Sequence, residues 1–228
     1  MARVYPCRWQ LVRNAALAAE VNLPTTTTYR LILASASPRR RELLAQAGYM
    51  FAVEAADVDE SVRVGESSND YVQRLAEEKA KAVFARRADP TRDGEAVTNE
   101  APELVVLGAD TTVVCDEEIL AKPEDGADAK RMLRRLSGRE HEVLTGVAVV
   151  TRAGVVSGVE STAVTFSEIP EAELDFYCAT SEPLDKAGAY GIQGYAARWI
   201  PRIDGDYFNV MGLPIARVVQ IIEGAVEQ

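Results

Sequence analysis

The sequence predicts an α/β fold built on a mixed sheet. Apolar strand-like runs and helical segments alternate along the chain, which is the order typical of a sheet covered by helices. Two pairs of strands in the middle are joined by short turns, at Asp116–Glu117 and near Gly154, so part of the sheet is antiparallel. The 228 residues, 47% of them apolar, suffice for one sizeable hydrophobic core.

The first half of the chain supplies three strands and two helices. Residues 31–34 and 51–55 are short apolar runs that predict buried strands. Between them a helix opens at Ser37, an N-cap residue followed by Pro38 at the first helical position, and ends at Gly48. A second helix spans about 69–87, and a polar surface loop follows it over 88–103. The next apolar strand, 104–115, is expected to be interrupted at Gly108 and Asp110.

The second half continues the alternation. A short helix is predicted over 128–138, strands over 142–151 and 155–166, and a helix over 170–180. Asp204–Gly205 marks a turn, and a terminal helix opens at Pro214.

Composition excludes several classes of protein. The net charge of -10 disfavours nucleic acid and membrane surfaces as partners, because both attract basic faces. Three distant cysteines and one histidine argue for a reducing compartment and against a zinc or multi-histidine centre. The cytosol is therefore the expected location. Residues 1–28, with three arginines and a closing threonine tract, are interpreted as an N-terminal extension, with organelle targeting as a minority alternative.

The corner between the first strand and the first helix gathers positive charge. A helix N-terminus attracts anions through its free N–H groups and its dipole. Ser35 and Ser37 add hydroxyls there, and Arg39 and Arg40 add guanidinium groups, which bind phosphate in a bidentate manner. The pattern favours a phosphate site, and the alternative is an ordinary capped helix with a solvated basic turn.

Three charged residues lie where burial is expected. Lys79 falls on the apolar stripe of the second helix, so it must extend to solvent, pair with an acid or meet an anion. Asp110 interrupts an apolar strand and needs a cation, a metal or a structural hydrogen bond. Glu60 belongs to an acidic cluster, which is either solvated or a second carboxylate for the site. His141 is expected to be structural rather than a catalytic base.

These residue types together predict phosphate-ester chemistry. Oxygen ligands without histidine favour Mg²⁺ or Mn²⁺, and carboxylates, a divalent ion, arginines and lysines are the components of such sites.

Seven stretches point to one family: LASASPRRRELL, LAEEKA, GADTTVV, LAKP, MLRRLSG, EPLDKAGAYGIQG and IDGDYFNVMGLP. In this order they resemble the Maf family of nucleoside triphosphate pyrophosphatases. The resemblance covers 31 to the C-terminal helix, so we divide the chain into the extension 1–28 and a Maf-like domain 29–228. The loop near 89–102 looks longer than is usual in the family. The resemblance implies a twisted mixed sheet with a central substrate cleft, of the Maf and inosine triphosphatase type, that is often dimeric.

The resemblance also implies roles for single residues. Asp110 matches the catalytic acid assigned as proton acceptor, Glu60 an acid that helps to hold the metal, and Lys79 and Lys122 the catalytic lysines. Ser35, Ser37, Arg39 and Arg40 match the phosphate-binding corner. Asp110 and Glu60 together would hold Mg²⁺ or Mn²⁺.

Three positions bear on the choice of substrate. Arg39, Thr111 and Gln193 resemble the branch of the family that cleaves dTTP and UTP to the monophosphate and pyrophosphate. A carboxamide both donates and accepts, which suits the N3–H and O4 edge of uracil or thymine; the alternative is that Gln193 only stabilises its glycine-rich loop. Two other functions remain open: a nucleotide-binding regulator of septum formation, and a 7-methyl-GTP or broad-range pyrophosphatase.

Overall fold

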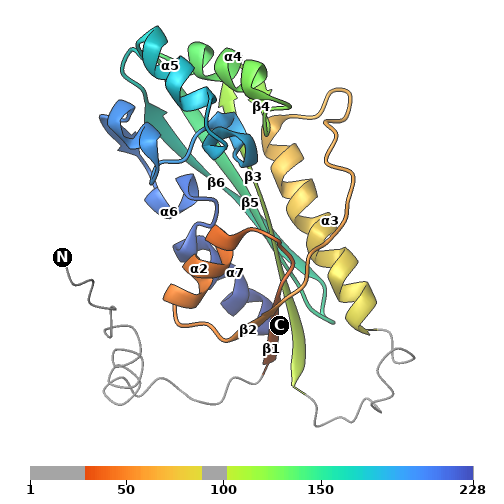
Figure 1. The fold of residues 1–228 in the computed structure, drawn as a ribbon. Coiled ribbons are helices and arrows are strands. Elements are labelled where there is room, and N and C mark those ends of the chain that lie inside the picture. Colours follow the sequence, from red (N-terminus) through yellow and green to blue (C-terminus); the bar gives the residue numbers. More distant parts are fainter. Residues whose placement is uncertain (1–28, 89–101, 228) are drawn as a thin grey trace, which may run out of the picture.

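The computed structural model describes residues 29–88 and 102–227. Its core is one seven-stranded sheet with the order β2-β1-β3-β5-β6-β7, and β4 pairs with β3 outside this path (Figure 1). β1 runs parallel to β2 and β3, whereas the other neighbours are antiparallel. The predicted mixed α/β sheet is thereby confirmed. The strands are β1 Tyr29–Leu33, β2 Phe51–Val53, β3 Glu103–Cys115, β4 Glu118–Leu120, β5 Glu140–Val150, β6 Val155–Thr165 and β7 Arg202–Asp204.

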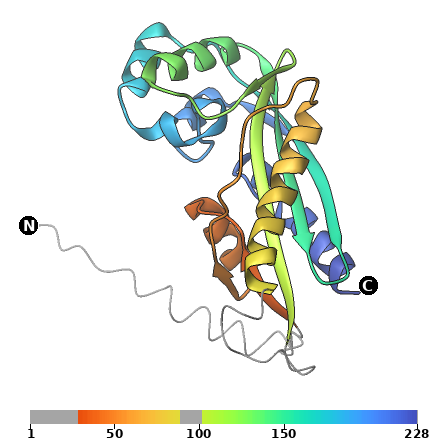
Figure 2. The ribbon, with the colours of Figure 1, turned by 90° about the vertical axis from the view of Figure 1, so that its right-hand side faces the viewer.

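Helices cover both faces of the sheet. The long α3 lies on one face and α2 and α7 lie on the other, while α4 and α5 pack at the far end of the long strands (Figures 1 and 2). Short 3₁₀ segments between α5 and β7 complete that end. The helices are α2 Pro38–Gln46, α3 Ser68–Ala88, α4 Gly126–Leu136, α5 Glu171–Cys178, α6 Tyr207–Val210 and α7 Ile215–Val226.

Local signals in the sequence are confirmed at several element ends. The Ser37 hydroxyl caps α2 by accepting from the backbone N–H of Arg40 at 3.4 Å, and Pro38 opens the helix. Asp116 and Glu117 have φ values of 49° and 67°, as expected of a tight hairpin turn between β3 and β4. The predicted surface loop 88–103 lies almost entirely outside the described residues, and the extension 1–28 lies outside them altogether.

The expected interruption of the third strand is wrong, because β3 runs unbroken from Glu103 to Cys115. Gly108 instead makes room for α3: a Cβ atom there would lie 2.2 Å from the carbonyl oxygen of Ala76. Gly146 on the neighbouring β5 has the same function, since its Cβ would lie 2.1 Å from the Val72 carbonyl oxygen. The two glycines allow α3 to pack directly on the sheet.

A gap along one edge of β3 positions the site. β1 pairs with β3 only as far as Leu107, and β4 begins to pair with the same strand at Val113. Between these two points the strand is paired with β5 but has no strand on its other edge within the described chain. Side chains from both faces of the sheet can therefore meet at Asp110.

Within residues 29–88 and 102–227, no helix has the length and apolar character that crossing a membrane requires.

We expect opposite stability effects from two Gly→Ala substitutions. Gly146→Ala forces a methyl group into the α3 backbone and lowers the free energy of unfolding by about 1–3 kcal/mol or more. Gly224 lies in the interior of α7, where a Cβ atom meets nothing within 4 Å. Gly224→Ala therefore raises the free energy of unfolding by about 0.5–1 kcal/mol. Urea unfolding measures both values, and a Gly146→Ala variant as stable as the wild type or more stable would contradict the packing role of Gly146.

Candidate active site

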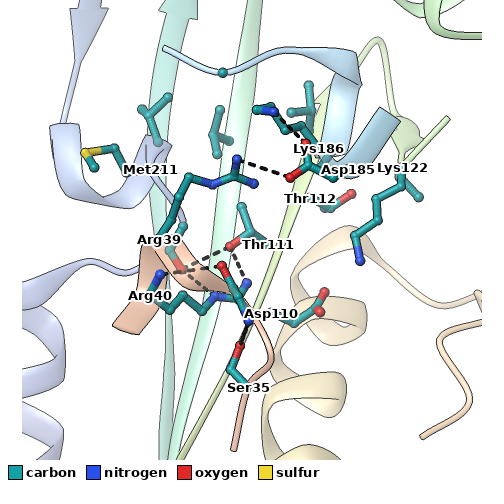
Figure 3. Close-up of a pocket in the computed structure, with 18 of the residues that line it drawn as sticks. Ser35, Arg39, Arg40, Asp110, Thr111, Thr112, Lys122, Asp185, Lys186 and Met211 are labelled. Atoms are coloured by element: carbon teal, nitrogen blue, oxygen red, sulfur yellow. Dashed lines mark hydrogen bonds and ion pairs between the residues drawn. The ribbon is translucent and has the colours of Figure 1, made fainter. Parts of the chain in front are cut away.

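A pocket of about 600 Å³ opens at the β3 gap (Figure 3). Its walls come from the N-terminal corner of α2, from β3 and α3, and from the segments that precede β7 and follow α6. All ten residues that the sequence singled out for the site line this pocket: Ser35, Ser37, Arg39, Arg40, Glu60, Lys79, Asp110, Thr111, Lys122 and Gln193. Their individual roles stay predictions.

Lys79 joins the two carboxylates of the pocket. Its ammonium lies 2.6 Å from Asp110 Oδ1 and 2.6 Å from Glu60 Oε1. Lys79 and Asp110 are each 8% exposed, so of the alternatives open to Lys79 the structure shows pairing with acids. Burial by itself would raise the pKa of Glu60, but the hydrogen bond and charge of Lys79 outweigh it and lower that pKa below its ordinary value. Glu60 is therefore an anion at neutral pH.

Arg40 is half-buried beneath the corner and joins α2, β3 and the segment after α6. All three guanidinium nitrogens donate: Nε to the Gly212 carbonyl at 2.8 Å, Nη1 to the Ala109 carbonyl at 2.7 Å, and Nη2 to Thr111 Oγ1 at 3.0 Å. Burial lowers the pKa of Arg40, and the nearby charge of Asp110 opposes this shift. Arg40 thus stabilises the edge of β3 that no other strand of the described chain covers, by its bonds to Ala109 and Thr111. A direct contact of Arg40 with a phosphate remains a prediction.

Arg39 and the two serines line the pocket at the corner. Arg39 extends across the pocket toward Asp185, at 3.7 Å between Nη1 and Oδ2 (Figure 3). Ser35 Oγ accepts from the backbone N–H of Ser37 at 3.2 Å. Each serine hydroxyl keeps a proton that it can donate to an anion.

Thr111, Lys122 and Gln193 occupy different sides of the pocket. Thr111 Oγ1 lies 2.9 Å from Thr145 Oγ1, so its hydroxyl is fixed between β3 and β5. Lys122 extends into the pocket from the chain after β4 (Figure 3). Gln193 is exposed at the tip of a turn closed by the bond from the Gly194 N–H to the Gly191 carbonyl, 2.9 Å long.

Sequence reasoning missed several residues that line the pocket. Glu182, Asp185 and Lys186 lie within the EPLDKAGAYGIQG stretch, but no periodicity or spacing distinguished them from their neighbours. Lys186 donates to the carboxylate of Asp185, which places Asp185 between Lys186 and Arg39. Tyr71, on α3, is a fourth such residue.

Tyr71 and Arg74 fasten the loop that carries Glu60 onto α3. The Tyr71 hydroxyl donates to the backbone carbonyl of Glu60 at 2.9 Å, and Arg74 Nη2 donates to the Ser61 carbonyl at 3.0 Å. Arg74 also pairs with Glu66 at the end of the same loop. Burial raises the pKa of Tyr71 to about 12, with Asp110 and Glu60 adding to the shift, so its phenol remains a neutral donor.

His141 lies away from the pocket, in the hydrophobic core. Its Nε2 is 2.8 Å from the Tyr190 hydroxyl, and its ring packs edge-on against Phe166. The residue is 3% exposed, and burial lowers the pKa of His141 to about 4. These contacts agree with the expected structural role.

The donor set fits a divalent cation that takes most of its ligands from the substrate. Among the residues described, no group of three or more His, Cys, Asp or Glu side chains could hold a metal. Two carboxylates nevertheless converge on Lys79 at the pocket wall. Mg²⁺ is commonly bound by one or two carboxylates together with substrate phosphates and water, and Glu60 and Asp110 meet that requirement.

The fold and the pocket together define an α/β enzyme with a site suited to a phosphorylated substrate. Residues 30–225 match the model of the Maf-like protein family. The chain belongs to the Maf family, as the seven motifs predicted.

Relatives in several bacteria carry the same name, dTTP/UTP pyrophosphatase. The Hahella chejuensis protein is 50% identical over 85% of this chain and 91% of its own length. The Koribacter versatilis protein is 50% identical over 86% of this chain and 94% of its own length. The Vibrio cholerae protein is 47% identical over 86% of this chain and 98% of its own length. The solved structure of the Staphylococcus aureus Ham1 protein aligns with 75% of this chain and 79% of that chain, at 14% identity and a TM-score of 0.37, a likeness too weak to bear on fold or activity.

Removal of the Tyr71 hydroxyl should weaken catalysis without unfolding the chain. Tyr71→Phe keeps the buried ring but frees the Glu60 loop, and we expect kcat/KM on a nucleoside triphosphate to fall by about five- to tenfold, the equivalent of one hydrogen bond. Tyr49→Phe, outside the pocket, serves as the matched control. Equal efficiencies for wild type and Tyr71→Phe would show that the loop does not depend on this bond.

Stability should depend on pH through His141. Because the pKa of His141 is lowered to about 4 in the folded state from an ordinary 6.5, the unfolded state binds more protons between these values. The full stability is therefore present above pH 6.5 and falls by about 3 kcal/mol as the pH drops toward 4.

The variant His141→Gln isolates this effect. The chain has one histidine, and ordinary carboxyl groups titrate lower, so the variant should lose the slope between pH 6.5 and about 5. Urea unfolding across this range measures it. An unchanged slope in His141→Gln would assign the pH dependence to other groups.

Proposed function

We propose that this chain hydrolyses dTTP and UTP between the α and β phosphates, releasing the monophosphate and pyrophosphate and so removing these nucleotides from the pool. The observation that carries the proposal is the pairing of Lys79 with both Asp110 and Glu60, at the wall of a pocket lined by further cations. The names of relatives about half identical to the chain support the choice of substrate.

The catalytic groups divide into carboxylates and cations. Asp110, or Glu60 beside it, accepts the proton of the water that attacks the α-phosphorus. Lys79 and Lys122 stabilise the negative charge that builds on the phosphate oxygens. Ser35, Ser37 and the N-terminus of α2 bind the phosphates, for which Arg39 and Arg40 also supply charge.

Glu60 and Asp110 would hold a divalent cation, Mg²⁺ or Mn²⁺. When bound, such an ion neutralises phosphate charge. Lys79 keeps the two carboxylates together, and that arrangement leaves each carboxylate its second oxygen for other partners.

Base selection is assigned to Arg39, Thr111 and Gln193. The Gln193 carboxamide reads the N3–H donor and O4 acceptor of uracil or thymine. Thr111 is held rigidly by Arg40 and Thr145, so it presents a fixed wall to the base.

The class of partner is inferred from the charge of the chain, and the location from the substrate. A net charge of -10 supports a free nucleotide as substrate rather than a nucleic acid. Nucleoside triphosphates are intracellular metabolites, which supports the cytosol. The homodimer implied by the family resemblance stays a prediction.

The first experiment is a panel of dTTP, UTP, CTP, 7-methyl-GTP and ATP with Mg²⁺ or Mn²⁺, with pyrophosphate and monophosphate measured separately. We expect rapid pyrophosphate release from dTTP and UTP. Preferential cleavage of 7-methyl-GTP would assign the chain to the other branch. Tight nucleotide binding without cleavage would identify a regulatory binding protein instead.

Asp110→Asn tests the catalytic carboxylate. The isosteric change removes the charge, and we expect turnover on dTTP to fall by about 10²–10³-fold, by analogy with other single groups that stabilise a transition state. Asp175→Asn changes a carboxylate that is 65% exposed on α5 and should retain wild-type turnover. Substantial activity in Asp110→Asn would remove this residue from the mechanism.

A further inference from the structure

Glu182 sits at the pocket wall and turns its carboxylate toward the turn Gly191–Gly194. Its Oε1 accepts from the backbone N–H of Tyr195 at 3.1 Å and from the Tyr177 hydroxyl at 3.2 Å. Among the ion pairs of the described residues, none includes Glu182. Its role is therefore that of a hydrogen-bond acceptor between two parts of the chain.

The contact between Glu182 and the turn leaves no space. A Cβ atom on Gly194 would lie 1.7 Å from Glu182 Oε1. The φ of Gly194 is -97°, which any residue can adopt, so the space beside the Glu182 carboxylate, and not the backbone conformation, favours glycine here. The turn and the carboxylate fit directly against each other.

Tyr177, the second partner of the Glu182 carboxylate, is fixed in the core. Tyr177 is fully buried, stacks on Tyr195 with ring centroids 5.8 Å apart, and meets Trp199 edge-on at 5.3 Å. Glu182 thus ties the turn to the aromatic part of the core.

The turn carries Gln193, which lines the pocket. The bond from the Gly194 N–H to the Gly191 carbonyl places Ile192 and Gln193 at the two corners of the turn. Glycines at both ends make the turn pliable, so its position depends on what holds Gly194 and Tyr195. The Tyr195 ring is held by its stacking on Tyr177, and the Glu182 carboxylate holds the backbone N–H of Tyr195, directly at the end of the turn.

We propose that Glu182 is a positioning residue for base selection, which holds the Gly191–Gly194 turn so that Gln193 meets the base from a fixed point. The inference rests on the proposed function, since Glu182 acts through Gln193. Cytosine presents an amino donor and a ring acceptor where uracil presents O4 and N3–H, and a carboxamide on a loose turn can adjust to either pattern. A fixed turn is needed to prefer one of them.

The test is the ratio of kcat/KM for UTP over CTP. In Glu182→Ala we expect this ratio to fall by about tenfold, the typical effect of one lost polar contact, with kcat on UTP nearly unchanged. Glu182→Gln keeps an oxygen acceptor at the same place and should retain the wild-type ratio. The proposal is overturned if Glu182→Ala keeps the wild-type ratio. It is also overturned if Glu182→Gln loses as much selection as Glu182→Ala does.

A double-mutant cycle shows whether Glu182 acts through Gln193. Gln193→Ala should lower the ratio by itself, and adding Glu182→Ala should lower it no further. If the double variant lowers the ratio by the product of the two single losses, Glu182 acts independently of Gln193. That result would overturn the proposal that Glu182 acts through Gln193.

Gly194→Ala approaches the same contact from the other side. The added methyl group must displace the carboxylate, so this variant should match the loss of selection in Glu182→Ala. In Gly194→Ala combined with Glu182→Ala the clash is absent, and the ratio should equal that of Glu182→Ala alone. Normal selection in Gly194→Ala would overturn the proposal even if Glu182→Ala failed to fold.

The wild-type enzyme separates the two levels of failure. Absence of pyrophosphate release from UTP in the wild type overturns the proposed function, and with it this inference. Normal selection in both the wild type and Glu182→Ala overturns only the role of Glu182.

Discussion

The structure depends on one buried ion pair, between Lys79 on α3 and Asp110 on β3, 2.6 Å apart. Neither charge could be buried alone, because removing one partner of such a pair typically costs about 3–5 kcal/mol. The pair therefore requires α3 to lie close to the sheet in one register. Gly108 and Gly146 satisfy this requirement, since any side chain at either position would strike the backbone of α3.

The pair also explains where the pocket opens. Asp110 lies in the stretch of β3 that neither β1 nor β4 covers, so its carboxylate can be reached from the gap. Arg40 supports the same stretch from the opposite face by binding the Ala109 carbonyl and Thr111. A cation on each side, buried Lys79 and half-buried Arg40, thus supports the edge of β3 that no other described strand covers, and a rigid edge is what preorganised catalysis needs.

The pocket combines a rigid side with an adjustable one. The Asp110, Glu60 and Lys79 side rests on α3 and the long strands, where the reacting phosphates are expected. The segment from Glu182 to Gly194 is made of short 3₁₀ turns and glycines, and its position relies on single contacts such as that of Glu182 with Tyr195. This division matches a site in which the chemistry is constant and the choice of base is set by one loop.

The sequence by itself determined the α/β class, the capped corner at Ser37, the hairpin at Asp116–Glu117 and ten of the residues that line the pocket, because short-range propensities and motif residues carry these features. Only the tertiary structure decided three matters. β3 continues through Gly108, Arg40 is directed inward, and Glu182 accepts from the backbone N–H of Tyr195, two residues after Gln193. Each depends on contacts between segments that are remote in sequence, or on the free space around a single atom. Neither can be predicted from the pattern of neighbouring residues in the sequence.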